Sequence, residues 1–166
     1  SINRVASVYA IEPFAPNFKA LQANIEANEW THVIKAEHLA LSNESGMANF
    51  ATQRHEIGSS GGQIGDISEF IPQNAYPVEV MTGDAYAVLH GCPNYVKIDV
   101  DGQEGRVIKG MEKILGDVAL KSLLVEYNSH NEAMNDYILG RGFVRDHELE
   151  RMRLRRDDFN RIYQRA

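Results

Sequence analysis

Three short apolar runs in this chain each end at a carboxylate and lead into a polar turn and a helical pattern. The runs and their acids are Val8 to Ile11 with Glu12, Tyr95 to Val100 with Asp99, and Leu123 to Val125 with Glu126. This alternation favours a mostly parallel sheet covered by helices, since parallel strands need crossover connections. Ligands of such sheets bind beyond the carboxyl ends of the strands, so we expect the three acids to meet at one rim.

The spacing of apolar residues predicts the remaining elements. Helices are expected at 16–28, 85–89 and 132–139 and over the apolar face from Val107 to Leu115, and further strands at 33–36, 47–52 and 78–81. Phe143 to Glu150 and Arg161 to Gln164 are expected to form two antiparallel strands. The predicted fold is therefore α/β and Rossmann-like: a doubly wound, mostly parallel sheet with a C-terminal antiparallel hairpin.

Composition limits the classes of function. A chain of 166 residues with 43% hydrophobic content can bury one substantial core, so residues 1–166 are expected to form one domain. The net charge of -6 argues against a nucleic-acid or anionic-membrane partner and favours a small polar substrate. No run approaches the roughly 20 apolar residues that cross a bilayer. The single cysteine, Cys92, permits no intrachain disulfide, so a cytoplasmic location is expected.

Each acid has a structural and a functional interpretation. Glu12 follows the first strand, where a carboxylate can accept both ribose hydroxyls of a nucleotide-like cofactor, or it is a solvated strand end. Asp101 either takes part in catalysis or caps the following helix, and Glu104 suits the positive first turn of that helix. Lys97 lies within an apolar strand, where a structural ion pair is its simplest interpretation.

Several motifs in chain order resemble one family. Tyr9-Ala10-Ile11-Glu12-Pro13 looks like its strand-and-helix signature, Ala40-Leu41-Ser42 its next loop, and Thr82-Gly83-Asp84 its Thr-Leu-Asp segment. The run Val96-Lys97-Ile98-Asp99-Val100-Asp101-Gly102-Gln103-Glu104 is similar to the Lys-Ile-Asp-Val-Glu-Gly-Ala-Glu motif of FkbM-type methyltransferases. Four segments matching in order, from about Val8 to Phe143, discriminate far better than one motif does.

The resemblance implies transfer of a methyl group from S-adenosyl-L-methionine to a hydroxyl oxygen of a sugar or a similar small molecule. By this analogy Glu12, with the adjacent Pro13, holds the cofactor ribose. Ala40 and Leu41 lie near the adenine, and Asp99 lies near the amino acid end of the cofactor or the reacting hydroxyl.

A carboxylate or histidine near the acceptor can take its proton. Asp99, Asp101 and His130 are the candidate catalytic residues, and Glu104 and Glu126 are the candidate substrate-binding residues. His130 is otherwise a polar loop residue. No metal site is predicted. The run from Asp99 reaches glycine at its fourth position, whereas a calcium-binding EF-hand loop has it at the sixth, and the histidines lack the paired helical spacing of a zinc site.

The sequence also departs from the family. Such enzymes begin with a strand and a turn of the type Val-Asp-Val-Gly-Ala-Asn-Xaa-Gly, which this chain lacks before Val8. We therefore expect an N-terminally truncated domain with unpaired strand edges, and a homodimer as their consequence. An inactive fragment or interaction module is the alternative function. A nicotinamide-dependent oxidoreductase is less favoured, because its glycine fingerprint is also absent.

Overall fold

The computed structural model of this chain describes residues 7–52, 58, 62–65, 75–127, 132–153 and 160–166. These residues fall into two compact units. Unit 1 comprises Ser1–Leu41 and Ser45–Met81, and unit 2 comprises Ser42–Glu44 and Thr82–Ala166. That residues 1–166 form a single domain stays a prediction. No helix among the described residues is long and apolar enough to cross a membrane.

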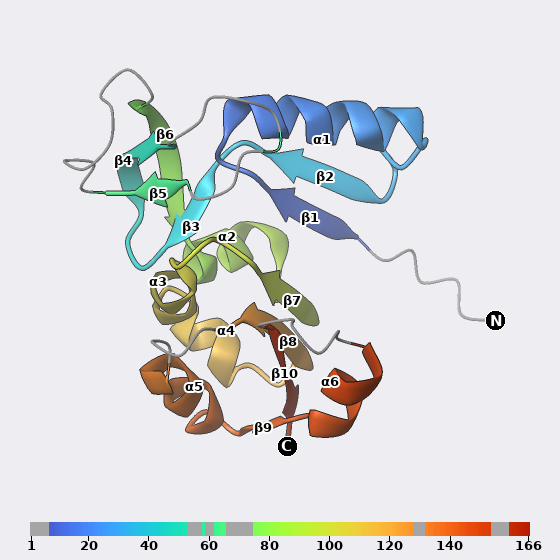
Figure 1. Cartoon of the computed structure of the whole chain (residues 1–166), viewed down its shortest axis with the longest axis vertical. Coiled ribbons are helices and arrows are strands. Elements are labelled where there is room, and N and C mark those ends of the chain that lie inside the picture. The colour runs from blue at the N-terminus through green and yellow to red at the C-terminus, as the bar shows by residue number, and fades with distance from the viewer. Residues whose placement is uncertain (1–6, 53–57, 59–61, 66–74, 128–131, 154–159) are drawn as a thin grey trace. The chain divides into compact units, whose positions relative to one another are not determined.

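Unit 1 combines one helix with strands of two sheets (Figure 1). Its described elements are β1 (Val8–Ile11), α1 (Ala15–Ala27), β2 (Ile34–Glu37), β3 (Ala40–Ser42), β4 (Gly46–Ala51), β5 (Gln63–Ile64) and β6 (Ala75–Thr82). β1 and β2 pair in parallel, whereas the order β3-β6-β4-β5 defines the second sheet. The predicted helix after the first strand is confirmed, and Pro16 lies in its first turn, where its missing N–H costs no hydrogen bond.

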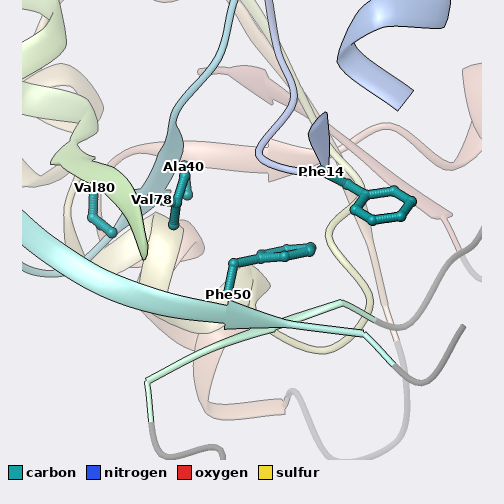
Figure 2. Close-up of a cluster of buried hydrophobic side chains, with 5 residues drawn as sticks. All are labelled: Phe14, Ala40, Phe50, Val78 and Val80. Carbon is teal, nitrogen blue, oxygen red and sulfur yellow. The ribbon is translucent and has the colours of Figure 1, made fainter. Parts of the chain in front are cut away.

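The core of unit 1 is a cluster of five buried side chains (Figure 2). They are Phe14, Ala40, Phe50, Val78 and Val80. Val78 and Val80 alternate along β6, as residues on one face of a strand do. The rings of Phe14 and Phe50 stack with centroids 6.1 Å apart. Burial of each large side chain contributes about 1.5–3 kcal/mol, so this cluster fixes the start of α1 against β4 and β6.

Unit 2 is a four-stranded sheet with five short helices among its described residues (Figure 1). Its elements are α2 (Gly83–His90), β7 (Tyr95–Ile98), α3 (Glu104–Lys109), α4 (Glu112–Gly116), β8 (Ser122–Glu126), α5 (Glu132–Leu139), β9 (Phe143–Arg145), α6 (His147–Arg153) and β10 (Asn160–Arg165). The strand order is β7-β8-β10-β9, with β7 and β8 parallel. β10 is antiparallel to both neighbours. The α/β class is therefore confirmed, and the parallel pairs are β1·β2 and β7·β8.

The predicted strand from Phe143 to Glu150 is wrong in its second half. β9 ends at Arg145, and α6 begins at His147. Asp146 explains the change, because its carboxylate accepts the N–H of Leu149 at 2.8 Å, as a helix-capping residue does. The antiparallel pairing itself is confirmed, with Tyr163 of β10 opposite Arg145. The charged sequence at 155–158 also predicts a turn between the two strands, and these residues lie outside the described part of the chain.

The single helix expected around Val107 to Leu115 is two helices, α3 and α4, separated at Gly110 and Met111. A Cβ on Gly110 would lie 2.1 Å from the carbonyl oxygen of Ser42, so glycine permits this close approach of backbones. The carboxylate of Asp84 then caps α4, accepting N–H groups of Lys113 and Ile114 at 2.9 and 3.0 Å. The apolar face was predicted correctly, because all five of its residues are buried: Val107, Ile108, Met111, Ile114 and Leu115.

Candidate functional site

Glu12 lies immediately beyond the carboxyl end of β1. Its backbone N–H donates to the carbonyl oxygen of Glu37 at 3.1 Å, which extends the β1·β2 pairing by one bond. Its carboxylate oxygen Oε1 accepts the backbone N–H of Phe14, two residues further along the chain, at 2.8 Å. The side chain is half-buried. The strand and the turn thus fix a carboxylate at the rim where α/β proteins bind ligands.

Two side chains from distant elements hold the turn after Glu12. The Tyr76 hydroxyl donates to the carbonyl oxygen of Pro13 at 2.9 Å and accepts the N–H of Ala15 at 3.0 Å. The Nε2 of His38 lies 3.1 Å from the same Pro13 oxygen, so Nε2 carries the hydrogen, because a carbonyl only accepts. The backbone from Pro13 to Ala15 is therefore tied to β6 and to the residue after β2.

The other predicted cofactor-binding residues of unit 1 differ in exposure. Ala40 is buried, with 2% of its surface exposed, and its side chain belongs to the core cluster that also contains Phe14. Leu41 and Pro13 are half-buried. Their contacts with an adenine or a ribose stay predictions.

A carboxylate at the position of Glu12 suits a vicinal diol chemically. An ionised carboxylate only accepts hydrogen bonds and offers about four acceptor positions, which the bond from Phe14 does not exhaust. The ribose hydroxyls of a nucleoside are donors that match this capacity. The Glu12 carboxylate is therefore chemically suited to accept the two hydroxyls of a ribose.

In unit 2, Asp99 and Glu126 lie at the same rim of the parallel pair. Ile98 is level with Val125 in the β7·β8 register, so the next residues, Asp99 and Glu126, come at the carboxyl ends of both strands. Asp99 pairs with Lys97, whose Nζ lies 2.6 Å from Oδ2. The predicted ion pair of Lys97 is thus confirmed. Both side chains are largely exposed, and such pairs contribute about 0–1 kcal/mol.

The turn after β7 closes on Glu104. Asp101 and Gly102 have left-handed φ angles of 51° and 94°, which turn the chain sharply. Glu104 is fully buried, and its Oε1 accepts the N–H groups of Val100 and Gly102 at 3.2 and 3.0 Å. Glu104 begins α3, as its predicted first-turn position requires. The N-cap residue of this helix is Gln103, two residues after Asp101.

Glu126 is the rim carboxyl whose environment favours its protonated form. Burial raises the pKa of Glu126, and the negative charges of Glu104, Asp99 and Asp101 raise it further. A hydrogen bond to the Glu104 carboxyl acts in the same direction. These effects act in one direction, so Glu126 holds its proton to a higher pH than an isolated glutamate does.

The structure therefore brings four of the predicted residues together in unit 2: Asp99, Asp101, Glu104 and Glu126. His130 lies outside the described residues. The described residues contain no group of three or more His, Cys, Asp or Glu side chains placed to hold a metal ion.

Sequence reasoning missed Tyr76 and the role of His38 in the Glu12 turn. It also missed Asn160, which is level with Glu126 in the β10·β8 register. The Oδ1 of Asn160 is buried and has no hydrogen-bond partner in the described part of the chain. No local pattern identifies these three residues, because the residues beside which they lie are distant in the sequence.

The described residues form an α/β fold with acids at the carboxyl ends of two pairs of parallel strands. A family model described as "Methyltransferase FkbM domain" matches residues 3–159. The chain therefore belongs to the FkbM methyltransferase family, as its motifs predicted. A comparison with curated proteins found no match.

A solved structure has the same fold. It is the methyltransferase FkbM from Methylobacillus flagellatus KT, with a TM-score of 0.61 and 16% sequence identity. The likeness covers 95% of this chain and 36% of the other, so this chain spans about a third of the length of that protein.

Proposed function

We propose that this chain is part of an S-adenosylmethionine-dependent methyltransferase that methylates a hydroxyl oxygen of a small molecule such as a sugar. The observation that carries the proposal is the family match over residues 3–159, which includes the acids that follow β1 and β7. The single cysteine, Cys92, supports a cytoplasmic location as part of the same proposal.

On the cofactor side, Glu12 accepts the ribose hydroxyls. The hydrogen bond from Phe14 supports this role, since it fixes the carboxylate at the strand end without exhausting its acceptor positions. Pro13, Ala40 and Leu41 complete the contacts with the nucleoside. S-adenosylmethionine supplies, when bound, a methyl group activated by a positively charged sulfur.

On the acceptor side, Asp99 and Asp101 orient the hydroxyl and receive its proton, with His130 as a further base. The position of Asp99 at the end of β7 supports its role. Glu126 contacts the acceptor, and its raised pKa suits it to hold a proton nearer neutral pH than an ordinary carboxyl does. Glu104 is fully buried, so its proposed role is indirect: it holds the turn after β7, and that turn positions the acceptor. Positioning of the hydroxyl supplies much of the rate in such transfers.

A methyl-transfer assay tests the proposal. The chain is incubated with S-adenosylmethionine labelled in its methyl group and a panel of sugars and other alcohols, with amino sugars included to distinguish oxygen from nitrogen acceptors. Label is expected in a hydroxyl-bearing product, and Asp99→Asn is expected to lower the rate about 100-fold.

The matched control is Asp117→Asn, which alters an exposed aspartate beyond α4 whose carboxylate accepts the N–H of Ala119. This variant is expected to retain the rate. Label on amino groups alone would contradict O-methylation. No transfer and no cofactor binding would favour an inactive fragment or an interaction module.

We also propose that the chain forms a homodimer. In the part of the chain that the structure describes, β1 and β7 are edge strands of their sheets, and such edges favour pairing with another chain. Light scattering during size-exclusion chromatography is expected to give twice the mass of one chain. A single-chain mass at high concentration would contradict the proposal.

A further inference from the structure

The turn after Glu12 has no regular secondary structure of its own between β1 and α1. β1 ends at Ile11 and α1 begins at Ala15, and side chains bind the Phe14 N–H and the Pro13 carbonyl oxygen in the turn between them. Phe14 at the end of this turn is buried in the core cluster, with 2% of its surface exposed (Figure 2). One end of the turn is therefore fixed by packing, whereas Glu12 and Pro13 are half-buried.

Tyr76 supplies hydrogen bonds on both sides of Phe14. Its single hydroxyl bridges the Pro13 carbonyl and the Ala15 N–H, which are separated by one residue of the chain. This geometry fixes the peptide groups on either side of Phe14. Glu12 bonds to Phe14 itself through Oε1, so the carboxylate depends on the orientation of the backbone that Tyr76 holds.

The Tyr76 ring is itself held rigidly. It packs against the core cluster and lies 5.6 Å from the Phe50 ring, centroid to centroid. Burial raises the pKa of the Tyr76 hydroxyl, and the bond from Ala15 lowers it in part. The negative charge of Glu12 raises the pKa as well, which indicates that the hydroxyl is close enough to sense this carboxylate. The hydroxyl therefore stays protonated and keeps donating to Pro13.

His38 adds a second donor to the same carbonyl from another direction. Its ring stacks on that of Phe18 in α1, with centroids 4.9 Å apart and planes 21° from parallel. The stacking fixes the ring, so Nε2 is held 3.1 Å from the Pro13 oxygen. The Pro13 carbonyl thus accepts two hydrogen bonds, from Tyr76 and His38, which uses both of its lone pairs.

From this geometry we infer that Tyr76 and His38 are positioning residues for cofactor binding. Together they hold the Pro13 carbonyl by two hydrogen bonds and so orient the Glu12 carboxylate toward the ribose of the cofactor. The inference rests on the proposed function of Glu12. Neither residue needs to touch the cofactor. Loss of these hydrogen bonds lets the turn reorient, so the Glu12 carboxylate spends less time in the orientation that accepts two hydroxyls. The affinity for the cofactor falls as a result.

The experiment uses S-adenosylhomocysteine as the probe, together with its 2′-deoxy analogue, which lacks one of the hydroxyls that Glu12 accepts. The variant Tyr76→Phe removes only the bridging hydroxyl. Tyr163→Phe is the matched control, because Tyr163 is a buried tyrosine whose hydroxyl is likewise hydrogen-bonded, to Asn135 in unit 2. Both variants lose one hydrogen-bonded tyrosine hydroxyl, so a general loss of stability affects them alike.

Three results are expected for Tyr76→Phe. Its affinity for S-adenosylhomocysteine falls about five- to tenfold, and its preference over the 2′-deoxy analogue narrows, whereas Tyr163→Phe keeps both. The amide of Phe14, which donates to Glu12, exchanges its hydrogen faster in Tyr76→Phe without any ligand. His38→Ala is expected to weaken binding, and His38→Gln, which retains a side-chain N–H donor, to restore part of it.

The outcomes separate the inference from the function on which it rests. Failure of the unaltered chain to bind S-adenosylhomocysteine would contradict both the proposed function and the inference that rests on it. Binding with an unchanged hydroxyl preference in Tyr76→Phe, together with unchanged exchange of the Phe14 amide, would overturn the inference alone.

Discussion

Glu12 and Glu104 both accept backbone N–H groups from a turn that follows a strand, but distant residues hold one turn and a local one holds the other. Tyr76 reaches the Glu12 turn across 61 and 63 residues of sequence, and His38 across 25. Glu104 instead closes its turn from two and four residues away. The first turn therefore depends on the packing of unit 1, whereas the second is encoded within its own motif.

The largest expected effect of a single change falls on the locally held turn. Glu104→Ala removes a buried acceptor and leaves the N–H groups of Val100 and Gly102 without it. We expect a loss of about 3 kcal/mol in the free energy of unfolding, measured by chemical denaturation. Glu104→Gln retains one acceptor oxygen and is expected to lose clearly less. Equal losses in the two variants would show that the hydrogen bonds do not hold the turn.

The turn held from a distance should be less sensitive to loss of one partner. Tyr76→Phe removes two hydrogen bonds but leaves the ring in the core and the bond from His38 in place. We expect the free energy of unfolding to fall by about 1–2 kcal/mol, measured by chemical denaturation. A loss as large as that of Glu104→Ala would remove the contrast between the two turns.

The rim of unit 2 should also show a dependence of stability on pH. The folded-state pKa of Glu126 is raised above its ordinary value of 4.5, so the folded chain binds this proton more tightly than the unfolded chain does. The contribution of Glu126 to stability is therefore full below the ordinary value and is lost as pH rises through the raised pKa. Denaturation of wild type and Glu126→Gln across this range is expected to show the loss only in wild type. A parallel pH dependence in the two chains would refute the assignment.

The smallest expected effect is that of the exposed pair at the end of β7. Lys97→Met removes the partner of Asp99, and because 63% and 46% of the two side chains are exposed, solvent already screens the attraction. We expect the free energy of unfolding to change by about 0–1 kcal/mol and to depend on salt only weakly. A loss above this range would show that the pair shapes the turn.

The contrast between the locally held Glu104 turn and the Glu12 turn, which distant residues hold, explains which parts of the fold the sequence could predict. The strand before Asp99 and the first-turn position of Glu104 follow from a contiguous pattern, and both are confirmed. The break between α3 and α4 was missed because its causes are distant: Ser42 crowds Gly110, and Asp84 caps the second helix. The helix α6 was missed although Asp146, its capping acid, provided a local signal.

The residues of the candidate site also divide into those that a local pattern identifies and those that only the packing of distant segments explains. Glu12 was identified from its place at the end of an apolar run, and the structure confirms that β1 ends just before it. Tyr76 and His38 could not be identified, because their role depends on which strands and turns pack together in unit 1. The raised pKa of Glu126 likewise requires the β7·β8 register, which aligns the carboxyl ends of the two strands.

The most direct test of the central claim is a calorimetric titration of the chain with S-adenosylhomocysteine, with NADH as the control ligand. Glu12→Gln is compared with wild type and with Glu26→Gln, an exposed glutamate of α1 in the same unit. We predict saturable binding to wild type and Glu26→Gln, at least about tenfold weaker binding to Glu12→Gln, and none of NADH. Equal affinity in all three chains, or no binding to wild type, would contradict the assignment of Glu12 to the cofactor.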